Sequence, residues 1–166
     1  MKRRNKSLFA AICGILLCVS CSAPTPKPYG AVPTEAQLAW QQMEINMFCH
    51  FGPNTFTGVE WGSGSESAEV FNPSNLDCCQ WVEVAEQAGM KGIIITAKHH
   101  DGFCLWPSKY STHTVAQTTW RGGKGDLLRE FVEACRGRVA AGVYISPWDR
   151  NHPTYGTLQY NEVFVN

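Results

Sequence analysis

The chain has 166 residues, of which 44% are hydrophobic and 17% are charged, a balance that suits one packed globular domain and argues against a disordered chain. The formal net charge is zero, but residues 1–21 hold four basic residues and no acidic one, which leaves 10 Lys and Arg against 14 Asp and Glu in the rest. This acidic excess disfavours nucleic acid as a partner.

Residues 1–21 have the pattern of an export signal. Four cations precede an apolar run, Leu8 to Val19, that is too short to span a bilayer. Cys21 follows this run after a small residue, which resembles a bacterial lipoprotein signal. We therefore expect a lipoprotein-type signal peptide over residues 1–21, acylation of Cys21, and a lipid anchor in the cell envelope, at the periplasmic or outer-membrane surface. Cleavage without acylation, which would give a secreted protein, is the alternative.

Residues 22–33 contain four prolines and predict an extended tether, and residues 34–166 predict a folded part in which helices and strands alternate. Thr34, Asp77 and Asp126 are candidate helix caps, and Gly89 and Gly137 are candidate left-handed stops. The expected elements are helices at 34–42, 77–88 and 126–135, strands at 47–51, 92–97 and 139–146, and a loop at 52–66.

This alternation of strand and helix predicts a parallel sheet in an α/β fold. The strand at 92–97 is apolar on both faces, as expected for a strand that helices cover. Two architectures fit, a doubly wound open sheet and a (β/α)8 barrel. No G-x-G-x-x-G motif follows a strand, so the barrel is favoured. We expect a partial (β/α)8 TIM-like barrel that comprises about the first three βα units.

Polar and aromatic side chains follow each expected strand. His50 closes the first strand, His99 and His100 follow the second, and Trp148 and Asp149 follow the third. The carboxyl ends of parallel strands meet at one face, where α/β enzymes keep their active sites. We therefore expect a site at this face.

Two kinds of ligand fit these residues. A metal-dependent hydrolase could use the three histidines, but adjacent histidines on an extended chain are expected to point to opposite sides and to share an ion poorly. A sugar needs fixed donors and acceptors for its hydroxyls and an aromatic wall for its apolar face. Glu60 and Trp61, in the loop after the first strand, add to such a site. A sugar is the favoured ligand, and no metal or cofactor is expected.

The motif Lys98-His99-His100-Asp101-Gly102-Phe103, together with Met47 to Gly52, Glu60-Trp61 and Trp81, resembles the glycoside hydrolase family 29 α-L-fucosidases. The resemblance runs from about Leu38 to Asn166. It implies that the following residues hold a terminal L-fucose: His50, Glu60, Trp61, His99 and His100. Trp148 and Asp149 belong to the same expected site. Many members carry two tyrosines before the serine of the third strand, whereas Ile145 follows Tyr144 here.

The resemblance also implies an activity. The family hydrolyses terminal α-L-fucosyl linkages of glycans by a retaining mechanism with two carboxyl groups. Residues 146–153 resemble the subgroup that acts on α-1,3 and α-1,4 linkages. Asp101 is expected to brace its loop, and no catalytic residue is assigned, because both carboxyl groups are expected beyond Asn166. This stretch alone is then expected to be inactive. The alternatives are the metal-dependent barrel hydrolase and a surface lipoprotein that binds fucosylated glycans without cleaving them.

Overall fold

A computed structural model describes residues 25–166, so the expected signal peptide and Cys21 lie outside the described part. The chain divides after Leu38 into two units. Helix α2 (Glu35–Met43) begins next to the predicted cap, because the amide of Gln37 donates to Thr34 Oγ1 at 3.2 Å. Among residues 25–166, no helix combines the length and the hydrophobicity needed to cross a membrane.

A three-stranded parallel sheet organises residues 39–166. It consists of β1 (Asn46–Cys49), β2 (Gly92–Lys98) and β3 (Ala140–Ile145), in the order β1-β2-β3. Phe48 pairs with Ile94 in one ladder, and Ile95 pairs with Val143 in the other. The mixed α/β fold and the parallel sheet predicted from the sequence are thereby confirmed.

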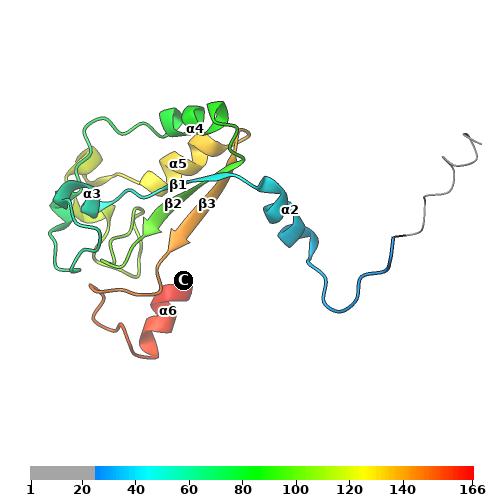
Figure 1. The fold of residues 1–166 in the computed structure, drawn as a ribbon. Coiled ribbons are helices and arrows are strands. Elements are labelled where there is room, and N and C mark those ends of the chain that lie inside the picture. Colours follow the sequence, from blue (N-terminus) through cyan, green and yellow to red (C-terminus); the bar gives the residue numbers. More distant parts are fainter. Residues whose placement is uncertain (1–24) are drawn as a thin grey trace, which may run out of the picture. The chain divides into compact units, whose positions relative to one another are not determined.

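Helices α4 (Cys78–Gln87) and α5 (Leu127–Cys135) lie side by side against one face of the sheet (Figure 1). Both start at the predicted caps. Asp77 accepts hydrogen bonds from the amides of Cys79 and Gln80, and Asp126 accepts one from the amide of Arg129. These side chains satisfy amides that have no partner within the first turn of a helix.

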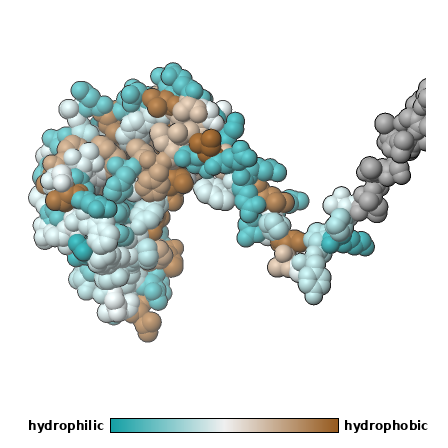
Figure 2. Space-filling view, viewed as in Figure 1, coloured by the Kyte–Doolittle hydropathy of each residue, from teal (hydrophilic) through white to brown (hydrophobic). Residues whose placement is uncertain are grey.

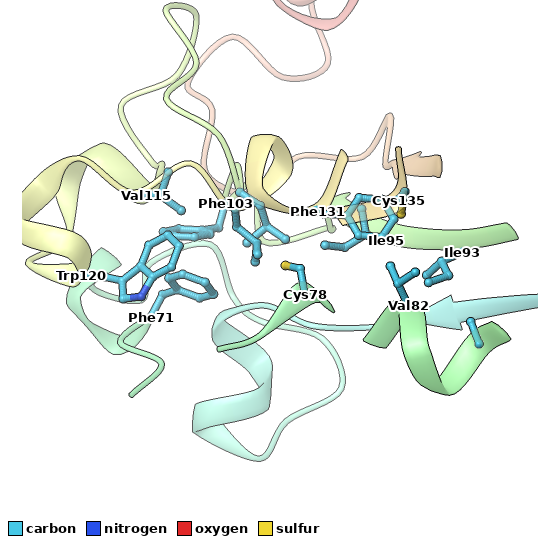
Figure 3. Close-up of a cluster of buried hydrophobic side chains, with 13 residues drawn as sticks. Phe71, Cys78, Val82, Ile93, Ile95, Phe103, Val115, Trp120, Phe131 and Cys135 are labelled. Carbon is cyan, nitrogen blue, oxygen red and sulfur yellow. The ribbon is translucent and has the colours of Figure 1, made fainter. Parts of the chain in front are cut away.

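The core lies between the two helices and β2 and continues into the loops through Phe71, Phe103 and Trp120 (Figure 3). Ile93 and Ile95 point toward the helices and are completely buried, together with Val82 and Phe131. In the described part, however, helices cover only this face of β2. On the other face Ile94 is half-buried and Phe48 of β1 is 53% exposed.

The first strand is shorter than predicted. It ends at Cys49 rather than at position 51, because the main chain of Phe51 pairs with a side chain of β2. The amide of Phe51 donates to Thr96 Oγ1, and the same hydroxyl donates to the carbonyl of Phe51, both at 3.0 Å. This double contact replaces the next step of the ladder and directs the chain into the loop.

The segment 52–66, predicted as a loop, contains the short helix α3 (Pro53–Thr57). Pro53 suits the first position of a helix, and Gly52 donates its amide to Thr55 Oγ1 at 3.3 Å. Five residues are too few to show a helical repeat of apolar residues. Helix α6 (Gln159–Val165) is the last element of the described residues.

Candidate functional site

The three predicted histidines meet at the carboxyl end of the sheet. The ring centroids of His50 and His99 lie 4.6 Å apart, and those of His99 and His100 lie 4.2 Å apart. Adjacent histidines were expected to point to opposite sides, and that expectation is wrong. Strand β2 ends at Lys98, so His99 and His100 sit where the chain turns and the alternation of a strand no longer applies.

Two tryptophans from different loops stand beside His100. The ring of Trp61 lies 5.2 Å from that of His100 and 5.7 Å from that of Trp148, both at nearly right angles. Trp148 completes the triangle at 5.0 Å from His100. Trp61 is 51% exposed, so its ring is accessible as an aromatic wall. Glu60 is exposed in the same loop, and its backbone carbonyl accepts a hydrogen bond from Asn54.

Ser146, a residue not assigned to the site from the sequence, fixes the orientation of His100. Its hydroxyl donates to the carbonyl of Trp148 at 2.9 Å and lies 2.7 Å from Nδ1 of His100. Because the single hydroxyl proton goes to the carbonyl, Nδ1 of His100 is assigned as the donor to Ser146 Oγ. In the neutral ring, Nε2 is then an acceptor.

The environment keeps both histidines of the motif neutral. Burial lowers the pKa of His99 to about 4, and the nearby rings of His100 and His50 act in the same direction. Burial also lowers the pKa of His100, and the cation of Arg150 contributes. At neutral pH each ring therefore has one N–H donor and one acceptor nitrogen, and Nε2 of His100 can accept a hydrogen bond from a hydroxyl group because Nδ1 is bound to Ser146. Nδ1 of His99 is buried and has no hydrogen-bond partner among residues 25–166.

Asp101 braces its loop, as predicted. One carboxylate oxygen accepts from the amide of Phe103 at 2.7 Å, and the other accepts from Nδ2 of Asn54 at 3.1 Å. Asp101 is 1% exposed, and burial raises its pKa although these hydrogen bonds oppose the effect. Both oxygens are engaged inside the protein, so the side chain links the loops after β1 and β2.

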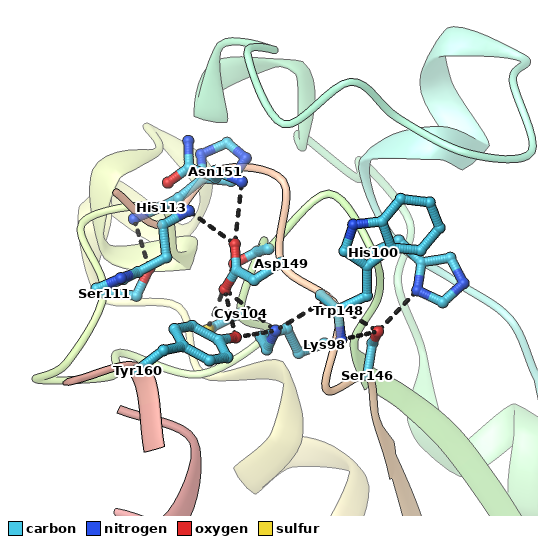
Figure 4. Close-up of polar contacts among 12 residues, drawn as sticks. Lys98, His100, Cys104, Ser111, His113, Ser146, Trp148, Asp149, Asn151 and Tyr160 are labelled. Atoms are coloured by element: carbon cyan, nitrogen blue, oxygen red, sulfur yellow. Dashed lines mark hydrogen bonds and ion pairs between the residues drawn. The ribbon is translucent and has the colours of Figure 1, made fainter. Parts of the chain in front are cut away.

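Asp149 does not join the histidines and tryptophans, although it was predicted to contact the ligand. It is 3% exposed and forms an ion pair of 3.1 Å with Lys98, while the hydroxyl of Tyr160 donates to it at 2.9 Å. Its other oxygen accepts from the amides of Asn151 and His152. Figure 4 shows this group beside the contact between Ser146 and His100.

The charge of Asp149 is stabilised where it lies. Burial alone would raise the pKa of its carboxyl group, but the amide of His152 and the cation of Lys98 outweigh burial and lower it. Gly102 makes this packing possible, because its φ is +85° and a Cβ atom there would lie 2.2 Å from Oδ1 of Asp149. The glycine of the motif is thus explained by packing rather than by contact with a ligand.

The comparison with known proteins identifies this arrangement. The family model for alpha-L-fucosidases matches residues 24–164. The chain belongs to the alpha-L-fucosidase family. It is 47% identical over 145 residues to Alpha-L-fucosidase 1 of Arabidopsis thaliana, which covers 86% of this chain and 29% of the plant protein. The resemblance read from the sequence is thereby confirmed.

Solved structures of the family agree. The crystal structure of a glycoside hydrolase 29 family member from an unknown rumen bacterium is 55% identical, with a TM-score of 0.80 over 83% of this chain and 25% of that one. A Ruminococcus gnavus glycoside hydrolase 29 fucosidase in complex with fucose is 35% identical, with a TM-score of 0.76 over 88% of this chain and 33% of that one. The chain thus spans about a third or less of the length of these relatives.

Proposed function

We propose that this chain forms the fucose-binding side of the active site of an α-L-fucosidase. The whole protein then hydrolyses terminal α-L-fucosyl linkages of glycans by a retaining mechanism. The proposed substrates are the α-1,3 and α-1,4 fucosyl linkages of branched glycans, because residues 146–153 resemble the subgroup of the family that acts on these linkages. We place the two carboxyl groups of the mechanism beyond Asn166.

The observation that carries this proposal is the packing of neutral histidines against an aromatic wall. Ser146 holds His100 so that its Nε2 is an acceptor, the ring of His99 lies 4.2 Å from that of His100, and Trp61 presents an accessible ring next to His100. A deoxysugar such as fucose has both hydroxyl groups and an apolar methyl group, so it uses both kinds of surface. The complex of the Ruminococcus gnavus relative with fucose supports this ligand.

We further propose that the sheet and its helices form about the first three units of a (β/α)8 barrel. The parallel order of the strands and the placement of the polar residues at their carboxyl ends support this architecture.

Acylation of Cys21 would hold the protein at the cell envelope, close to extracellular glycans. Incorporation of labelled palmitate that Cys21→Ser abolishes would support the anchor, and a released, unlabelled protein would support secretion.

The activity is tested on the full-length gene product with 4-nitrophenyl α-L-fucoside. We expect release of nitrophenol, which His99→Gln and Trp61→Ala reduce about tenfold or more through lost substrate contacts. Trp40→Ala removes an exposed tryptophan of α2 outside the site and serves as the matched control. Activity that a chelator abolishes and added metal restores would favour the metal-dependent hydrolase. Fucose binding without hydrolysis would favour a glycan-binding lipoprotein.

A further inference from the structure

Arg150 connects the loops that follow all three strands. Its backbone amide donates to the carbonyl of His100 at 2.9 Å, which ties the loop after β3 to the loop after β2. Its Nη1 donates to the carbonyl of Gly62 at 2.9 Å, which ties it to the loop after β1. Gly62 is the immediate neighbour of Trp61, so this contact fixes the main chain beside that tryptophan.

The guanidinium of Arg150 also lies over both tryptophans. Its Cζ atom is 4.4 Å from the ring centroid of Trp148 and 5.9 Å from that of Trp61. Both distances fall within the range of a cation–π contact. Within residues 25–166 the ion pairs do not include Arg150, so its charge faces rings and a carbonyl group rather than a carboxylate.

The neighbouring residue reinforces the same link. Nδ2 of Asn151 donates to the carbonyl of Gly64 at 2.7 Å. Gly64 has a φ of +84°, and a Cβ atom there would lie 2.5 Å from the carbonyl carbon of Arg150. The loop after β1 therefore rests directly on the main chain of residues 150 and 151, and this close approach requires a glycine.

We propose that Arg150 is a positioning residue of the fucose site, which holds the rings of Trp61 and Trp148 against His100 so that they form one wall of the pocket. The inference rests on the proposed function, since the wall is useful only if a sugar occupies the pocket. A lysine could not replace Arg150, because the planar guanidinium stacks on a ring and directs its N–H groups at the same time.

The same cation acts on His100. Arg150 contributes to the lowered pKa of that ring, after burial. The other titratable groups around His100 are Lys98, His99, Asp101 and His50. Of these, Lys98 and His50 lower the pKa as Arg150 does, and Asp101 raises it. Removal of the guanidinium charge should therefore raise the pKa of His100 and move the acidic limb of substrate binding to higher pH.

The test compares Arg150→Ala and Arg150→Lys in the full-length protein with Arg136→Ala, which removes an exposed arginine after α5. For 4-nitrophenyl α-L-fucoside we expect KM to rise about tenfold in Arg150→Ala with kcat within about twofold, as for lost ground-state contacts. Arg150→Lys should keep the acidic limb of the pH profile near that of the wild type, yet show most of the increase in KM. Arg136→Ala should match the wild type.

A purely structural Arg150 would give another result. Its removal would lower the melting temperature but leave KM and the pH profile of the folded enzyme unchanged, and that result would overturn the inference. If Arg150→Ala does not fold, the KM of Arg150→Lys decides. If the wild type hydrolyses no fucoside, the proposed function fails. Calorimetry with L-fucose then tests the positioning role of Arg150 separately. Equal Kd values in wild type and variants, or no binding by either, would overturn that role.

Discussion

At the scale of single residues, the site combines neutral histidines with a buried ion pair that lies next to them. His99 and His100 are suited to hydroxyl groups because burial and neighbouring cations or rings lower their pKa values. Lys98, the residue before them, extends instead into the ion pair with Asp149. The motif thus serves two purposes, since its histidines form the pocket and its lysine fastens the loop after β3.

Asp149→Asn should destabilise the protein by about 3 kcal/mol, because it leaves the charge of Lys98 buried without its partner. The folded-state pKa of Asp149 is lowered below its unfolded value of about 4. Its stabilisation is therefore complete above that pH and is lost as pH falls through the folded pKa. In urea unfolding, the stability of the variant should fall less than that of the wild type as the pH is lowered below about 4. Glu133→Gln, which breaks an exposed pair, should change stability little.

His99 should contribute to the pH dependence in the same direction as Asp149, but over a higher pH range. Its pKa is about 4 in the folded protein and about 6.5 in the unfolded chain, so the unfolded chain takes up the proton first. The stability that depends on His99 is complete above about pH 6.5 and is lost as pH falls toward 4. NMR titration should give its ring a pKa near 4, and a titration near 6.5 would contradict this account.

Reasoning from the sequence located part of this site. The meeting of His50, His99 and His100 follows from one rule, that parallel strands bring their carboxyl ends to the same face. The burial of Asp149 could not be foreseen, because it depends on Tyr160 and on the direction that Lys98 takes. Arg150 follows the third strand as Trp148 and Asp149 do, but its role could not be foreseen, because its contacts join three loops that are far apart in the sequence.

At the scale of elements, local signals were sufficient for the helices that cover the sheet. Asp77 and Asp126 cap α4 and α5, and Gly89 and Gly137 end them with φ values of +74° and +72°. The end of β1 and the presence of α3 were not predicted. The end of β1 depends on a contact with the side chain of Thr96, and α3 is too short to show a helical periodicity in the sequence.

Gly102→Ala should test how tightly the loop after β2 packs. Its positive φ costs an alanine about 1–2 kcal/mol, and its Cβ would also displace the carboxylate of Asp149. Gly137→Ala has a similar φ but open space around its Cβ, so it carries only the conformational cost. We expect Gly102→Ala to lose about 2 kcal/mol more than Gly137→Ala in urea unfolding. Equal losses would show that the loop adjusts freely.

At the scale of the whole molecule, the described sheet exposes apolar surface. Within residues 25–166, β1 and β3 each pair on one side only, and hydrophobic residues are exposed along β3 (Figure 2). Val143 is 49% exposed and Ile145 is 39% exposed. Unpaired strand edges with apolar side chains favour association with other chains.

We therefore expect this 166-residue chain, produced without further sequence, to associate as its concentration rises. Val143→Lys places a charge on β3 and should reduce association, as measured by light scattering coupled to size exclusion. Val132→Lys places the same charge on an exposed position of α5 and should have a smaller effect. A monomer with a sharp and reversible thermal transition would contradict the expectation.

We propose that the residues at the carboxyl ends of the strands hold fucose. Calorimetry of L-fucose binding to the full-length protein tests it directly, with D-fucose as the ligand control and His152→Gln as the variant control. We predict binding of L-fucose that weakens about tenfold or more in the double variant His99→Gln/His100→Gln, in line with the loss of two hydrogen-bonding groups. Equal affinity for L-fucose in the wild type and the double variant would contradict the central claim.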